Sequence, residues 1–77
     1  MSNHQQWPSH QKKLYNSVVN SNHQLKNNMT KEQKIHLGRL WETQAEIYSD
    51  LLKTTDYPDD LADVVAEQRV INLVLKS

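Results

Sequence analysis

The sequence contains no cysteine, no phenylalanine, one glycine and two prolines among its 77 residues. Without cysteine the chain forms neither a disulfide nor a thiolate metal site. The single glycine, Gly38, excludes a glycine-rich phosphate-binding loop. No apolar run is long enough to cross a bilayer and no secretory signal pattern is present, so we expect a cytoplasmic protein with no membrane partner.

Hydrophobic residues are also scarce, at 36% of the chain. A chain of this length forms at most one domain, here 1–77, and buries only a modest fraction of its surface. Small domains usually depend on disulfides, a metal or oligomerisation for stability. Because cysteine is absent, we expect homo-oligomerisation.

The residues that could carry chemistry do not form a catalytic or metal-binding pattern. Four histidines are present, but no two have the four-residue spacing that places two imidazoles on one helical face. The acidic residues Asp56, Asp59, Asp60 and Asp63 lack the glycine and the glutamate of a calcium-binding loop, and they suit a helix N-terminus better. We therefore expect no enzyme activity, no metal and no cofactor.

The clearest periodicity lies in residues 30–55 and predicts one long amphipathic helix. Thr30 and Gln33 match a capping box at its start. Gly38 lies at the edge of the apolar face, where we favour a tolerated exposed glycine over a close helix crossing. The apolar face, about 120° wide, includes two aromatic residues that we assign to the core, Trp41 and Tyr48. Its full set is Leu37, Leu40, Trp41, Gln44, Tyr48, Leu51 and Leu52.

Two further helices are predicted, at about 8–26 and 58–76, and residues 1–6 are expected to be disordered. The first helix has an apolar face at helical spacing but is rich in asparagine and serine, so it should depend on packing. The short connection to residue 30 favours an antiparallel hairpin. The predicted fold class is all-α: a three-helix arrangement built on an antiparallel helical hairpin with a long central helix, expected to be homo-oligomeric.

The C-terminal residues 70–75 are apolar almost all round a helix, so we expect two other helices to be unable to cover them. A β-strand at 69–75 is the alternative, because valine and isoleucine are frequent there. We expect an interface with a partner or a second copy. The residues predicted for this interface are Trp7, Val70, Ile71, Leu73, Val74 and Leu75.

Charge is unevenly distributed along the chain. Residues 1–40 contain six basic residues against one acidic residue, and residues 41–77 contain three against eight, so the halves carry +5 and −5. This asymmetry favours pairing within the chain or between copies, and nucleic-acid binding by the basic half is the alternative. The candidate ligand or nucleic-acid contacts are Lys12, Lys13, Tyr15 and Tyr57.

Part of the sequence resembles phage helical-hairpin proteins that sequester cyclic nucleotides. The resemblance covers about half of the chain: the run Thr30-Lys31-Glu32 with Ile35, Leu37, Arg39 and Leu40, after a proline-led helix bearing Tyr15. The spacing between helices differs and the third helix has no counterpart, so we do not assign the chain to that family. The resemblance implies a nucleotide-sequestering oligomer.

These features together favour a small non-enzymatic protein-binding module. We expect it to act stoichiometrically as a regulator, adaptor or inhibitor of another protein, as small proteins encoded by phages and mobile elements often do. A nucleic-acid-binding regulator and a nucleotide-sequestering oligomer are the alternatives.

Overall fold

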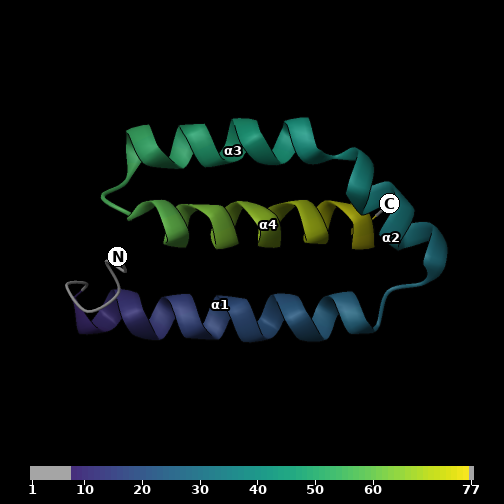
Figure 1. The fold of residues 1–77 in the computed structure, drawn as a ribbon, viewed down its shortest axis with the longest axis horizontal. Helices are drawn as coiled ribbons and strands as arrows, with labels where there is room; N and C mark the ends of the chain where they lie inside the picture. The colour runs from purple at the N-terminus through teal and green to yellow at the C-terminus, as the bar shows by residue number, and fades with distance from the viewer. Residues whose placement is uncertain (1–7, 77) are drawn as a thin grey trace.

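The computed structural model describes residues 8–76, which form four helices and no strand. The helices are α1 (Ser9–Asn27), α2 (Lys31–Arg39), α3 (Trp41–Thr54) and α4 (Asp59–Lys76). They are joined by short connections (Figure 1). The all-α prediction is confirmed, and the strand alternative for residues 69–75 is wrong because α4 continues through them.

The prediction of one continuous helix over residues 30–55 is wrong, because the helix is interrupted at Leu40. The backbone of Leu40 has φ −96° and ψ 21°, and its N–H donates to the Leu37 carbonyl at 3.1 Å, a bond across three residues. The Gln44 N–H then donates to the Leu40 carbonyl at 2.9 Å, and α3 begins. Gly38 precedes the interruption and has low helix propensity.

The N-terminus of α2 has the predicted capping box. The Thr30 hydroxyl accepts from the Gln33 N–H at 3.1 Å, and the Thr30 N–H donates to the Gln33 side-chain oxygen at 2.9 Å. Nothing lies within 4 Å of the position that a Cβ would take at Gly38. The close helix crossing considered for Gly38 is therefore wrong, and the residue is exposed.

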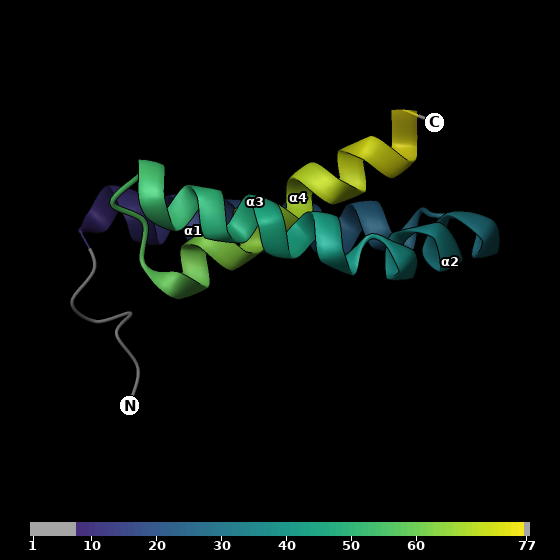
Figure 2. The same cartoon turned by 90° about the horizontal axis from the view of Figure 1, so that it is seen from above.

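The fold is organised around α4. It lies between α1 and α3, and both pack mainly on it (Figure 1). In the perpendicular view, α4 runs at an angle to the other long helices and α2 lies near its C-terminal half (Figure 2). The principal contact of α1 is thus with α4, not with α2, so the predicted hairpin of the first two helices does not organise the fold.

The core contains two clusters, one toward each end of α4. The Met29 cluster contains Met29, Ile71 and Val74, with Leu25, Leu37 and Leu40 packed against it. The Leu51 cluster contains Leu51, Ala62 and Ala66, with Ile47, Tyr48, Tyr57 and Val65 packed against it. The two alanines are four residues apart on one side of α4, and their small side chains let α3 approach closely.

Residues 70–75 were expected to be too apolar for two other helices to cover, and the position of α4 corrects this expectation. Val70, Ile71 and Val74 are fully buried by the same chain, because α4 is covered from two sides and by α2 near its C-terminus. Two or more helices packed on different sides can cover an apolar helix without a second molecule. Leu73 and Leu75, in the same part of α4, are not buried: they are 48% and 40% exposed.

The face of α1 that meets α4 has a spacing of four and three residues in alternation. It comprises Gln11, Tyr15, Val18, Asn22 and Leu25, followed by Met29 after the helix ends. Gln11 and Asn22 are buried polar residues, whereas Leu14 is 36% exposed. The interface between α1 and α4 is therefore partly polar.

Candidate partner-binding groove

A shallow open groove of about 320 Å³ lies between α3 and α4. Its lining comprises Trp41, Gln44, Ala45 and Tyr48 from α3 and Asp63 from α4. The α3 residues lie close together because positions 41, 44, 45 and 48 follow the three- and four-residue spacing of one side of a helix. The volume is at the lower end of the range for small-molecule pockets, and the open shape suits side chains of another protein better than an enclosed ligand.

Trp41 is the most exposed large apolar residue among those described, at 66%. The sequence assigned Trp41 to the core because it continued the apolar face of an uninterrupted helix. The interruption at Leu40 makes Trp41 the first residue of α3, and the core contacts of that helix begin further along, at Ile47, Tyr48 and Leu51. An indole exposed to this degree beside a groove is a common anchor in protein interfaces.

Tyr48 links the groove to the Leu51 cluster, against which its ring packs. Desolvation by burial, together with the negative charges of Asp59, Asp63 and Asp60, raises the pKa of the Tyr48 hydroxyl above its usual value of 10.0. Both causes disfavour the phenolate. The first turns of α4 therefore place a negative field next to two aromatic rings.

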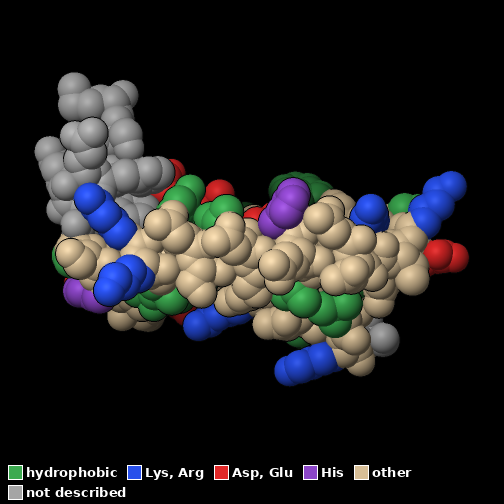
Figure 3. All heavy atoms as spheres, turned by 90° about the horizontal axis from the view of Figure 1, so that it is seen from below, with side chains coloured by type: hydrophobic (Ala, Val, Ile, Leu, Met, Phe, Trp, Pro, Cys, Tyr) green, Lys and Arg blue, Asp and Glu red, His purple; other side chains and the backbone are tan. Residues whose placement is uncertain are grey.

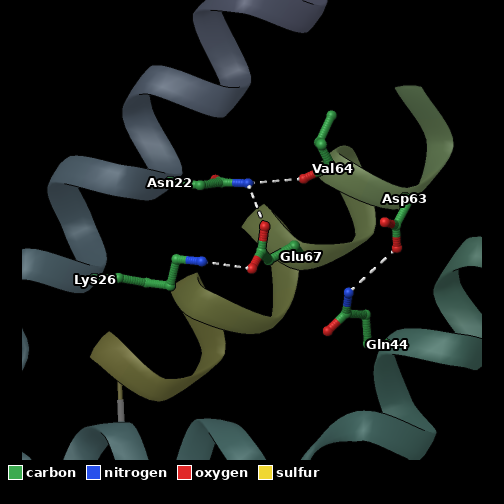
Figure 4. A network of polar contacts seen from close by, with 6 residues as sticks. All are labelled: Asn22, Lys26, Gln44, Asp63, Val64 and Glu67. Atoms are coloured by element: carbon green, nitrogen blue, oxygen red, sulfur yellow. Dashed lines mark hydrogen bonds and ion pairs between the residues drawn. The ribbon is translucent and has the colours of Figure 1, made fainter. Parts of the chain in front are cut away.

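Polar contacts hold the neighbouring helices in register (Figure 4). The Gln44 amide nitrogen lies 3.5 Å from an Asp63 carboxylate oxygen, a weak contact across the groove. On the other side of α4, the Asn22 amide nitrogen donates to the Val64 carbonyl at 3.0 Å and to Glu67 at 3.3 Å. The Lys26 ammonium is 2.8 Å from Glu67.

The residues predicted for a C-terminal interface fall into three groups. Val70, Ile71 and Val74 lie in the core of the chain and present no surface to a partner. Leu73 and Leu75 are exposed on α4. Trp7 lies outside the described residues.

Three of the four predicted ligand contacts belong to α1, and the fourth, Tyr57, lies in the connection between α3 and α4. Lys12 and Lys13 are exposed near the start of α1, whereas Tyr15 and Tyr57 are half-buried. Tyr57 packs against the Leu51 cluster, so its ring is partly used in the core. Figure 3, which looks onto the side formed by α1, shows mainly uncharged polar surface with scattered basic side chains.

The groove can hold an apolar or a cationic side chain. Its walls offer two aromatic rings, the Ala45 methyl group and one carboxylate, and aromatic faces attract both kinds of group. Within residues 8–76, no group of three or more acidic or histidine side chains is placed to hold a metal ion. In that same part of the chain, no helix combines the length and hydrophobicity needed to span a membrane.

Comparisons with protein-family models, with curated proteins and with solved structures find no match.

Proposed function

We propose that this chain is a non-enzymatic protein-binding module that acts stoichiometrically, as an adaptor, regulator or inhibitor, and that its docking site is the groove at Trp41. The exposure of Trp41 beside Tyr48 is the observation that supports the proposal most directly. Interface energy is usually concentrated in a few tryptophan, tyrosine and arginine side chains. Burying the exposed indole against a partner would remove a large apolar area from water.

The proposal is tested by placing a photo-crosslinking amino acid at Ala45 in the protein expressed in its native host. Ala45 lines the groove, so the proposal expects a discrete crosslinked product containing another protein. The matched control carries the same amino acid at Asp50, which is exposed on α3 and lies about 140° around the helix from Ala45. Adding Trp41→Ala should reduce the product at position 45. No product at position 45, or equal products at both positions, would contradict the proposal.

Nucleic-acid binding is the second candidate, favoured by the exposed Lys12 and Lys13 on a helix without acidic residues. Binding to phosphates releases counterions, so affinity would fall steeply with salt. A mobility shift at about 50 mM salt that disappears at about 200 mM would support this candidate. The double variant Lys12→Glu/Lys13→Glu would abolish such a shift.

A further inference from the structure

Opposite sides of the molecule carry opposite charge. α1 exposes Lys12 and Lys13, and the sequence has no acidic residue from position 8 to position 31. On the other side of α4, the exposed residues of α3 and of the start of α4 include six carboxylates against one lysine, Lys53. These carboxylates belong to Glu42, Glu46, Asp50, Asp59, Asp60 and Asp63.

Contacts within the chain use only part of this complementarity. Lys26 pairs with Glu67 on the side of α1 that faces α4. Lys12 and Lys13 lie nearer the start of α1 and are exposed. Asp63 also remains exposed, with the weak Gln44 contact at 3.5 Å. Exposed basic residues on α1 and exposed acidic residues on α3 are thus both accessible on one molecule. These two helices lie on different sides of α4 (Figure 1).

We propose that the occupant of the Trp41 groove is α1 of a second copy of this chain. Lys12 and Lys13 of that copy would approach Asp63 and Asp59, and a lysine stem would lie against the rings of Trp41 and Tyr48. Lysine suits this groove because its apolar stem packs on aromatic surface while its ammonium reaches a carboxylate or a ring face. This inference depends on the proposed function only in using the same docking groove.

The charge distribution also determines the symmetry of the association. A two-fold pairing through α1 would bring lysines together, and a two-fold pairing through α3 would bring carboxylates together. Head-to-tail pairing, in which α1 of one copy meets the groove of the next, avoids both repulsions. Head-to-tail contacts do not stop at two copies unless the rotation closes a ring, so the mean mass should rise beyond a dimer with concentration.

The test uses sedimentation of the full chain and of two variants, up to about 1 mM protein because small exposed interfaces bind weakly. Lys12→Glu/Lys13→Glu keeps the groove and removes the basic surface. Asp63→Lys keeps the basic surface and reverses the charge of the groove. Each variant alone should be monomeric, and an equimolar mixture should associate again. In the mixture the unchanged basic surface of one variant meets the unchanged groove of the other, and the new glutamates meet the new lysine, so both contacts are complementary.

Three further measurements complete the test. Raising the salt from about 0.1 M to about 1 M shortens the Debye length from about 10 Å to about 3 Å, so association of the unmodified chain should weaken by about tenfold or more. Lys53 is exposed near the end of α3 and does not line the groove, so Lys53→Glu should leave the mass unchanged. Trp41→Ala should abolish growth as Asp63→Lys does.

Folding of each variant is checked by circular dichroism. Glutamates at positions 12 and 13 lie near the N-terminus of α1, where the helix dipole favours negative charge, so that variant should fold. A chain that stays monomeric up to about 1 mM, or variants that still dimerise alone, would overturn the inference. A monomeric chain that still captures another protein through position 45 would leave the proposed function standing.

Discussion

Replacement of Asn22 tests how the interface between α1 and α4 is held together. Asn22 is 2% exposed, and its amide nitrogen donates to two oxygens, the Val64 carbonyl at 3.0 Å and Glu67 at 3.3 Å. Its side-chain oxygen is buried without a hydrogen-bond partner. Because both neighbours of the nitrogen are acceptors, flipping the amide would place oxygen against oxygen, so this orientation is required.

Asn22→Asp replaces the donor by a second oxygen that faces the same two acceptors. An uncompensated buried charge costs about 3–5 kcal/mol, which is a large part of the roughly 4–12 kcal/mol that a domain of this length has in total. Protonating the new carboxyl removes the charge and restores one donor. We therefore expect a loss of about 3–5 kcal/mol in the free energy of unfolding at neutral pH, partly recovered in mild acid.

Asn22→Leu is the matched control of similar size. It forfeits the two hydrogen bonds, worth about 1 kcal/mol each, and it removes the unpaired oxygen, whose burial costs about 1–3 kcal/mol. Glu67 keeps its ion pair with Lys26 at 2.8 Å. We expect stability within about 1 kcal/mol of the unmodified chain.

Urea unfolding followed by circular dichroism measures both variants, provided that the transition is two-state. The reasoning is refuted if Asn22→Asp costs less than about 1 kcal/mol, or if Asn22→Leu costs as much as Asn22→Asp.

Three further predictions concern separate sites. Gly38→Ala should raise the melting temperature, with a gain of about 0.5–1 kcal/mol, because nothing within 4 Å obstructs a methyl group and alanine favours helix; an unchanged or lower melting temperature would contradict this. Thr30→Ala should cost about 1 kcal/mol in urea unfolding through loss of the capping box, whereas Thr54→Ala, at the exposed end of α3, should cost less. The raised pKa of Tyr48 means that the folded state holds the phenol proton more tightly than the unfolded state does. The protonated phenol therefore contributes to stability below pH 10, and this contribution is lost as the pH rises through the higher pKa of the folded state. The fall in unfolding free energy at alkaline pH should therefore be smaller in Tyr48→Phe than in the unmodified chain. An identical fall in both proteins would exclude a contribution from Tyr48.

Local signals in the sequence predicted most of the helix boundaries. Thr30 with Gln33 defines the start of α2, and Pro58 with the two following aspartates precedes α4. These features act within one helical turn, so they can be recognised without knowing the rest of the fold. The interruption at Leu40 was missed because one glycine in a periodic stretch costs only about 1 kcal/mol and does not by itself end a helix.

The arrangement of the helices and the groove could not be predicted in the same way. The choice of α4 as the central helix depends on contacts between residues far apart in sequence, such as Asn22 with Val64. The sequence signal for the central position of α4 was that its C-terminal turns are apolar on every side. We interpreted that signal as an interface with another molecule. Trp41 was placed in the core because its exposure follows from the interruption at Leu40 and from where α4 lies.

The amide side chains between α1 and α4 explain how the two helices pack in one register. Aliphatic packing has no directional preference, so a smooth apolar face on α1 could meet α4 in several registers. Displacing α1 by one turn, about 5.4 Å, would separate Asn22 from the Val64 carbonyl and Lys26 from Glu67 together. A single buried asparagine at such a position selects one register in coiled coils, at a cost in stability. The same selection here would fix which residues of α1 face outward, and the proposed head-to-tail contact requires that Lys12 and Lys13 be among them.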